Sequence, residues 1–157
     1  MERVVETADA LGLAIELRLM DQSTRTAEDA AAACGCDVAQ IVKSLAFEDL
    51  DSGAIVLLLV SGKHNADLDF IAQQRGLRLG RCDGRRVRDE TGFAIGGVAP
   101  IGHLIDVPIY MDQALLSYEA VWAAAGRPDS VLRVNPKDLC NSINAIVIDV
   151  NAIDHER

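Results

Sequence analysis

The sequence predicts a single domain, residues 1–157, of mixed α+β class, in which short helices flank a curved, partly barrel-like mixed β-sheet. A chain of 157 residues fits one domain and buries about 68–70% of its unfolded surface without a disulfide or metal as support. Stretches with strand periodicity and stretches with helix periodicity follow one another irregularly, and one turn joins two neighbouring strands. This order favours a mixed class over a doubly wound α/β fold.

Helices are predicted where apolar residues recur at helical spacing between capping residues. Thr26 and Asn135 have the side chains of N-caps, and Pro136 suits a first helical position. The predicted helices cover residues 3–13, 26–34, 65–76 and 115–125, and one more begins at 135–136. Residues 37–40 and 84–90 are predicted as short helices or connecting loops.

Strands are predicted where apolar and polar residues alternate, or where a short apolar run is bounded by turn residues. Asp51, Ser52 and Gly53 form a turn signal between two such runs, so residues 41–47 and 54–61 should make a hairpin. The second run is apolar on both faces and should lie at the centre of the sheet. The other predicted strands cover residues 14–19, 77–81, 108–111, 131–134 and 145–150.

Composition limits the possible functions. The net charge of −9 argues against broad binding to nucleic acid such as DNA, because Lys and Arg must neutralise phosphates. Six arginines lie between residues 75 and 88, and a solvated face balanced by neighbouring acids is the slightly favoured explanation. No apolar run is long enough to span a membrane, and the first residues lack the apolar core of a signal peptide. We therefore expect a cytoplasmic protein without a membrane partner.

Metal and cofactor sites are not expected. Cys34 and Cys36 are too close in sequence for the usual zinc-binding spacing, and His64, His103 and His155 show no ligand pattern either. The four cysteines should be reduced thiols, mostly in the core.

The segment from Thr91 to His103, TGFAIGGVAPIGH, is the most unusual in local chemistry. Adjacent glycines and a proline without an N–H exclude a helix interior or a regular central strand. We expect a strand that ends in a tight loop, where Gly96, Gly97 and Val98 offer backbone N–H groups to a ligand. An ordinary turn explains the glycines about equally well.

Lys43 interrupts an apolar row in the strand 41–47, where it shares one face with Ile41, Leu45 and Phe47, while Ser44 lies on the other face. A buried ammonium without a partner is costly, so Lys43 should pair with an acid, reach the edge of the sheet, or bind an anionic ligand. A structural ion pair is the commoner outcome. We nevertheless expect the Lys43 ammonium to face the Gly96–Val98 amides across one hollow.

Familiar catalytic patterns are absent: the sequence has no nucleophile elbow, P-loop or dinucleotide-binding glycine motif. What remains is Lys43, the amides of Gly96–Val98, and hydroxyls at Thr26, Ser44 and Ser61. These groups suit an ester whose oxyanion is held by backbone N–H groups while the lysine holds a nearby phosphate. A general base is missing, unless His103 or the substrate supplies one.

Three segments in this order resemble the YbaK/prolyl-tRNA-synthetase-associated editing domain: QIVKSLAF at 40–47, LLVSGK at 58–63 and TGFAIGGVAPIG at 91–102. The likeness extends over nearly the whole chain. It implies the fold of that family and a metal-independent hydrolase without a cofactor. The expected activity is trans-editing, in which a free-standing aminoacyl-tRNA deacylase hydrolyses mischarged tRNA, typically proline tRNA carrying a small amino acid. The expected partners are the CCA acceptor end of that tRNA and, as a candidate, prolyl-tRNA synthetase.

The resemblance assigns roles to single residues. Lys43 matches the family's lysine that contacts the acceptor end, and Gly96 and Pro100 match the G-x-x-x-P loop that holds the ester and the attacking water. Together with Gly97, these form the expected catalytic set. Thr26, Ser44, Ser61, Gly62, Val98 and His103 are expected to bind substrate. In the family a ribose hydroxyl, or the thiol of the substrate, assists the reaction.

The substrate amino acid is left open. Cysteine-specific members carry other side chains at the positions that align with Thr26, Ala124 and Val131, so a cysteine-cyclising mechanism is disfavoured. Alanine, 2-aminobutyrate, serine and threonine remain candidates. A cavity lined by Thr26, Ser44 and aliphatic residues would select by size, at about 1–3 kcal/mol per methylene.

Two other functions stay open from the sequence. One is a binding module of the same fold that docks on an acceptor end or a synthetase without turnover. The other is a structural partner domain that pairs through a sheet edge.

Overall fold

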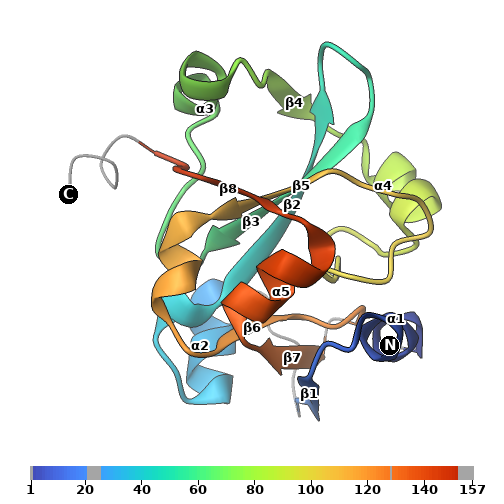
Figure 1. The fold of residues 1–157 in the computed structure, drawn as a ribbon, viewed down its shortest axis with the longest axis vertical. Helices are drawn as coiled ribbons and strands as arrows, with labels where there is room; N and C mark the ends of the chain where they lie inside the picture. The colour runs from blue at the N-terminus through green and yellow to red at the C-terminus, as the bar shows by residue number, and fades with distance from the viewer. Residues whose placement is uncertain (1, 21–25, 128, 152–157) are drawn as a thin grey trace.

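The computed structural model describes residues 2–20, 26–127 and 129–151, so the segment 21–25 and His155 lie outside it. Figure 1 labels the helices and strands along the chain. The helices are α1 (Glu2–Leu11), α2 (Ala27–Cys34), η1 (Val38–Gln40), α3 (Leu68–Arg75), α4 (Gly84–Thr91), η2 (Gln113–Ser117) and α5 (Pro136–Ile143). The strands are β1 (Ile15–Leu19), β2 (Val42–Asp49), β3 (Ile55–Ser61), β4 (Leu79–Arg81), β5 (Ile109–Asp112), β6 (Val121–Ala124), β7 (Ser130–Val134) and β8 (Ile146–Ile148).

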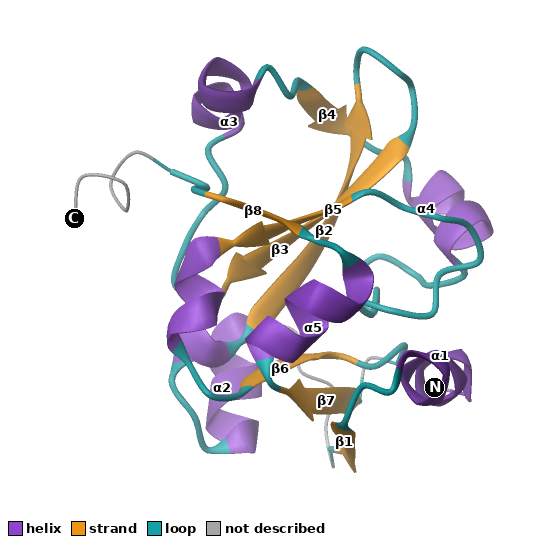
Figure 2. Ribbon diagram, viewed as in Figure 1, coloured by secondary structure: helices purple, strands orange, loops and turns teal. Residues whose placement is uncertain are grey.

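The strands form two sheets, with orders β1-β7-β6 and β4-β2-β3-β5-β8 (Figure 2). The smaller sheet is antiparallel, whereas the larger one is mixed, because β3 pairs parallel with β5 and β5 parallel with β8. A single parallel bridge between Ile41 and Trp122 links the sheets. The mixed α+β class is thus confirmed. The sheet that the sequence suggested as one curved unit is divided, and the described strands do not close into a barrel.

The β2–β3 hairpin is confirmed, with Lys43 opposite Val60 and Ser44 opposite Leu59. Every residue of β3 is buried, which agrees with its apolar character on both faces. Because β3 lies between β2 and β5 in the larger sheet, it is the central strand around which the core is built.

Local capping chemistry places the helix ends. The Thr26 hydroxyl accepts from Asp29 N–H at the start of α2, and the Asn135 side chain accepts from two N–H groups at the start of α5. Gly35 and Gly76 adopt left-handed conformations, with φ of 69° and 67°, just after α2 and α3. Only residues without strain at positive φ end helices in this way at low cost.

The helix predicted over residues 115–125 is wrong. A short 3₁₀ helix, η2, ends at Ser117, and residues from Val121 to Ala124 form strand β6. The alanines favour a helix locally, but antiparallel pairing with β7 satisfies their backbone and buries Val121 and Trp122. Gly126, with φ of 98°, therefore lies in the β6–β7 turn instead of capping a helix.

The strand predicted at the start of the Thr91–His103 segment is also absent. Thr91 is the last residue of α4, and Gly92 ends that helix in a left-handed conformation with φ of 84°. The residues that follow, as far as the start of β5, form no helix or strand. The predicted loop around Gly96 and Gly97 is present, but it follows a helix and not a strand. We call residues 92–103 the glycine loop.

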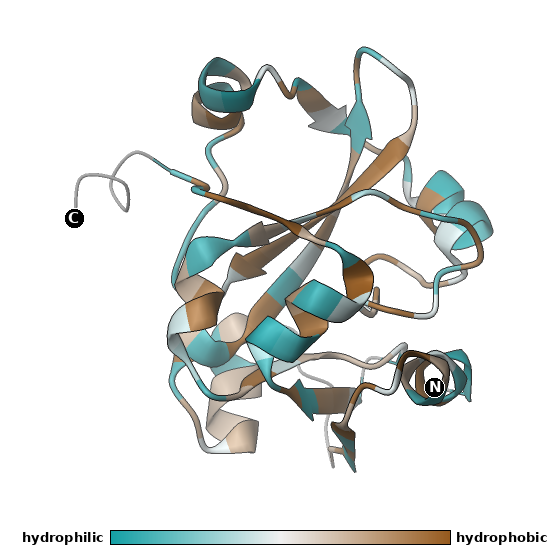
Figure 3. Cartoon of the chain, viewed as in Figure 1, coloured by the Kyte–Doolittle hydropathy of each residue, from teal (hydrophilic) through white to brown (hydrophobic). Residues whose placement is uncertain are grey.

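The main core fills the space between the two sheets and is closed by α1 and α5, whereas a second cluster packs α3 on the other face of β3. Figure 3 shows hydrophobic residues concentrated on the central strands and hydrophilic ones on the outer helices. Within the described ranges, no helix has the length and apolar character needed to cross a membrane.

Candidate active site

A cavity of about 480 Å³ lies along β2. This volume is typical of sites that enclose a small molecule. The lining comes from α2, β2, β6, β7 and the loop after α4, and it is mostly aliphatic with one indole. The lining residues are Thr26, Ala27, Ala30, Ile41, Val42, Lys43, Ser44, Leu45, Ala46, Phe47, Ile95, Gly96, Val98, Trp122, Ala123, Ala124 and Val131.

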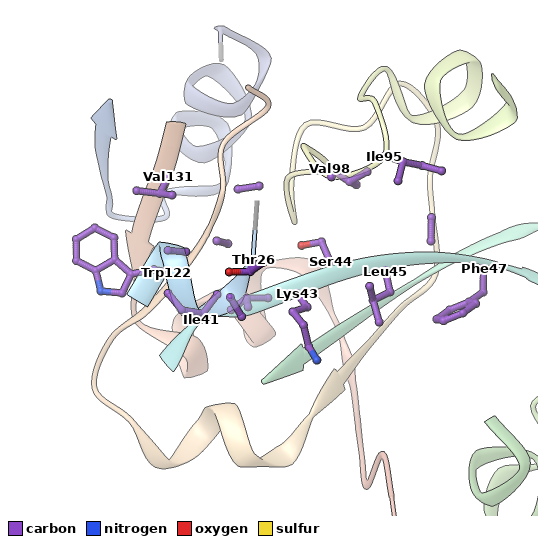
Figure 4. A pocket seen from close by; sticks show the side chains of 17 residues that line it. Thr26, Ile41, Lys43, Ser44, Leu45, Phe47, Ile95, Val98, Trp122 and Val131 are labelled. Carbon is purple, nitrogen blue, oxygen red and sulfur yellow. The ribbon is translucent and has the colours of Figure 1, made fainter. Parts of the chain in front are cut away.

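Ser44 provides a polar group in this apolar wall. Its side chain points from β2 toward the loop that carries Val98, as Figure 4 shows. The Ser44 hydroxyl oxygen is buried and makes no hydrogen bond among the described residues. A buried hydroxyl without a partner is costly, and such exceptions are candidates for contacts with a ligand.

The glycine loop forms the opposite wall. Gly96 has φ of 89°, where a side chain would be strained, and a Cβ at this position would point into open space. Gly97 N–H donates to Ala94 O, whereas within the described chain the N–H groups of Gly96 and Val98 have no recorded acceptor. A Cβ on Gly97 would lie 3.9 Å from the Gly126 backbone, so Gly97 faces the β6–β7 turn.

Arg3 of α1 holds both ends of this loop. Its Nε donates to Gly102 O at 3.1 Å, and its Nη2 donates to Gly92 O at 2.7 Å. The guanidinium also lies 4.8 Å from the centre of the Phe93 ring, at a distance typical of a cation–π contact. Arg3 was not among the predicted site residues, and no local pattern in the sequence singles it out.

His103 braces the same loop from inside. Its Nε2 lies 2.7 Å from Ala99 O, and its ring packs edge-on against Phe93. Burial is the main cause that lowers the pKa of His103 below its usual value; the nearby Arg3 charge lowers it further, and the contact with Ala99 O opposes the shift. His103 does not line the cavity, so the prediction that it binds substrate or acts as base finds no geometric support.

The Lys43 side chain does not point in the expected direction. Its amine extends to the opposite side of β2 from Ser44 and Val98 (Figure 4) and donates to the carbonyl of His64. The expectation that the ammonium faces the Gly96–Val98 amides is therefore wrong for this structure. The reason is strand alternation, which gives the face toward the loop to Ser44. Burial lowers the pKa of Lys43, while the charges of Glu28 and Asp112 oppose the shift.

A buried His64–Asp112 pair lies next to this lysine. His64 Nδ1 is 2.7 Å from Asp112 Oδ2, and the same oxygen accepts from Ser61 N–H. Asp112 is fully buried. His64 follows β3, and Asp112 ends the neighbouring parallel strand β5, so the topology brings the two together. This pair was not predicted from the sequence. Its only signal was that both residues follow adjacent apolar strands.

The remaining predicted residues support the site from outside the cavity. Ser61 Oγ donates to Ala39 O, and a Cβ on Gly62 would come within 2.4 Å of Val38 O. Pro100 is buried in the glycine loop. Of the ten predicted residues, the cavity brings together Thr26, Lys43, Ser44, Gly96 and Val98, and it leaves out Gly97, Pro100, Ser61, Gly62 and His103.

Two further observations concern the cavity lining and metals. Thr26, Ala124 and Val131, the positions compared with cysteine-specific members in the sequence, all line the cavity. Within the described ranges, no three His, Cys, Asp or Glu residues are grouped in a way that could hold a metal ion. Trp122 was not predicted as a site residue because its segment was taken for a helix.

Comparisons with known proteins agree with this geometry. The sequence profile described as "Aminoacyl-tRNA editing domain" matches residues 21–141. The uncharacterized protein YwhH of Bacillus subtilis (strain 168) is 30% identical over 131 residues, which is 83% of each chain.

Solved structures give the same result. A structure titled as that of "a putative trans-editing enzyme for prolyl tRNA synthetase" is 42% identical, with a TM-score of 0.87, and the match covers 96% of this chain and 95% of the other. The hypothetical protein APE2540 is 29% identical, with a TM-score of 0.86 and coverage of 94% and 98%. The profile, the relatives and the apolar cavity with its glycine loop lead to one conclusion: this chain belongs to the aminoacyl-tRNA editing domain family.

Proposed function

We propose that this protein is a trans-editing deacylase that hydrolyses the ester of mischarged tRNA. Its substrate is proline tRNA carrying a small amino acid: alanine, 2-aminobutyrate, serine, threonine or cysteine. The observation that carries the proposal is the cavity itself, an apolar chamber with the unpaired Ser44 hydroxyl on one wall and, on the other, Gly96 and Val98, whose N–H groups have no recorded acceptor among the described residues.

In the proposed reaction, water attacks the carbonyl carbon of the ester and the bond to the ribose oxygen breaks. The Gly96 and Val98 N–H groups stabilise the oxyanion, and removing one such donor typically slows a reaction by about 10²–10³-fold. The proton of the water passes to the leaving ribose oxygen. The described part of the cavity wall contains no histidine or carboxylate, so a neighbouring hydroxyl of the terminal ribose serves as the base.

Lys43 contacts the acceptor end from the other side of β2. Its ammonium has three donors, and the carbonyl of His64 occupies one of them. A phosphate oxygen of the terminal nucleotides accepts from another. Burial lowers the pKa of Lys43 because the partly buried ammonium is incompletely hydrated. A bound phosphate would offset this desolvation cost.

The side chain of the substrate amino acid lies against Thr26, Ala124 and Val131. The space there decides which amino acids fit, and one methylene more or less changes the free energy of discrimination by about 1–3 kcal/mol. The Ser44 hydroxyl accepts a hydrogen bond from the α-ammonium of the substrate. Prolyl-tRNA synthetase is a candidate partner through the shared tRNA.

The test is a panel of proline tRNA charged with each candidate amino acid or with proline, with and without a metal chelator. We expect release of at least one small amino acid, no release of proline, and no effect of the chelator. Failure to release any amino acid above the spontaneous rate would exclude the deacylase.

The second candidate is a binding module of the same fold. The observation that favours it is the absence of a histidine or carboxylate among the described lining residues. It predicts tight binding of charged tRNA that protects the ester, so that the rate of spontaneous hydrolysis falls when the protein is added.

A further inference from the structure

The arginines between residues 75 and 88 fall into two groups in the structure. Arg86 pairs with Glu48 and Glu90, and Arg78 lies 3.2 Å from Asp51. Arg75, Arg81, Arg85 and Arg88 are exposed, and no ion pair is recorded for them within the described ranges. A solvated face balanced by acids, which the sequence slightly favoured, accounts for the first group only.

Two of the exposed arginines, Arg85 and Arg88, lie on the helix beside the mouth of the cavity. A Cβ on Gly84, the first residue of α4, would be 3.1 Å from Cδ1 of Ile95. Ile95 lines the cavity and is itself 63% exposed. Gly84 and Arg88 are one helical turn apart, and Arg85 and Arg88 are three residues apart, so these residues share one side of α4.

The other sides of α4 contact the rest of the protein. Val87 and Thr91 are buried, and Arg86 with Glu90 faces the tip of the β2–β3 hairpin. Asp83 caps the helix by accepting from Arg85 N–H. The outer side that carries Arg85 and Arg88 is therefore available, apart from the exposed Asp89 one turn after Arg85.

Charge is distributed unevenly around the cavity. Figure 4 shows Ile95 and the neighbouring helix α4 at one end and Thr26 with Trp122 at the other. Next to Thr26, the first turn of α2 exposes Glu28 and Asp29. A polyanion whose end enters the cavity is repelled on the α2 side and attracted on the α4 side.

We propose that the outer face of α4, formed by Arg85 and Arg88, binds the sugar-phosphate backbone of the tRNA acceptor arm. The inference rests on the proposed function, because the aminoacylated end of that tRNA must occupy the cavity. Exposed arginines bind phosphates through charge and bidentate hydrogen bonds, and they do so without reading sequence. This surface explains how a chain with a net charge of −9 binds RNA at one defined place.

The test compares a long and a short substrate. The double variant R85Q/R88Q is assayed on proline tRNA charged with alanine and on alanyl-adenosine, which has the ester but no acceptor arm. We expect KM for the tRNA to rise about tenfold or more with kcat unchanged, and no change for alanyl-adenosine. The slope of log affinity for uncharged proline tRNA against log salt should fall by roughly two, one per lost contact.

The matched control removes the same charge elsewhere. R75Q/K137Q changes exposed residues of α3 and α5 that do not line the cavity, and it should bind tRNA like the wild type. The single variant D89N, which removes the acid next to Arg85, should bind tRNA more tightly.

The inference is overturned if R85Q/R88Q binds uncharged tRNA like the wild type, or if R75Q/K137Q weakens binding equally. If R85Q/R88Q binds tRNA as the wild type does, the face of Arg85 and Arg88 would instead bind an acidic protein partner. If the wild type cleaves neither ester, the proposed function fails, and the binding measurements with uncharged tRNA still decide the role of the arginines.

Discussion

At the scale of single residues, two neighbours on β2 differ in a way that suggests their functions. The Ser44 hydroxyl is buried toward the cavity without a partner, whereas the Lys43 amine leaves the opposite face and donates to His64 O. An unpaired buried hydroxyl does not stabilise the free protein. Its presence is explained when a bound substrate supplies the missing hydrogen bond.

Ser44→Ala should therefore separate activity from stability. We expect the free energy of unfolding to stay constant or rise, while kcat/KM for deacylation falls roughly tenfold, the value of one hydrogen bond. Ser61→Ala is the contrast, because Ser61 Oγ bonds to Ala39 O. It should lower stability by about 1–3 kcal/mol and affect activity less. Denaturant unfolding and deacylation rates measure both; equal behaviour of the two variants would refute the assignment.

Lys43→Met keeps most of the side-chain volume and removes the charge. We expect deacylation of tRNA to fall at least tenfold, with binding of uncharged tRNA weakened, since the contact with a phosphate is lost. Lys63→Met, at an exposed position three residues after Val60, is the control and should retain activity. Full activity of Lys43→Met would remove this lysine from the mechanism.

At the scale of elements, the loop after α4 acts as one unit because it is fastened at both ends. Arg3 bonds to Gly92 O and Gly102 O and stacks on Phe93, and His103 contacts Ala99 O within the loop. The Gly96 and Val98 amides between these points owe their position to those contacts. Preorganised donors stabilise a developing charge without further reorganisation.

Arg3→Lys should loosen this loop while keeping the positive charge. A lysine lacks the planar fork that serves two carbonyls at once. We expect stability to fall by about 1–2 kcal/mol and kcat for deacylation to fall more than KM changes. Hydrogen exchange of the Gly96 and Val98 amides should rise in the same variant. An unchanged exchange rate together with full activity would show that α1 does not position the loop.

At the scale of the whole molecule, the cavity is formed where α2 and the glycine loop meet strands of both sheets. Residues from α2, β2, β6 and β7 share its wall, although they lie far apart in the chain. The same packing buries His103 in a setting that disfavours its charged form.

This burial predicts a pH effect on global stability. The folded-state pKa of His103 is lowered, so the unfolded chain binds more protons as pH falls through about 6.5. The contribution of His103 is therefore fully present above that pH and is lost below it. Denaturant unfolding should show stability falling between pH 7 and pH 5.5, and less so in His103→Gln. An equal pH dependence in both proteins would contradict the effect.

Much of the fold was predictable because local backbone chemistry dictates it. Alternation and a turn signal located the β2–β3 hairpin, and Thr26 and Asn135 marked helix starts correctly. The prediction failed at Val121–Ala124, where alanine favours a helix but pairing with β7 decides for a strand. Of the cavity wall, the sequence identified five residues but not Trp122, and it did not identify Arg3, His64 or Asp112 around it.

The sequence by itself determined the mixed class, the glycine loop and the family, because each depends on residue types at short spacing. Only the tertiary structure decided which side of β2 faces the loop, which carbonyl holds Lys43, and what fastens the loop. These contacts join residues as far apart as Arg3 and Gly102, 99 positions along the chain. Such pairings arise when packing selects among many possible partners, and no local pattern records that choice.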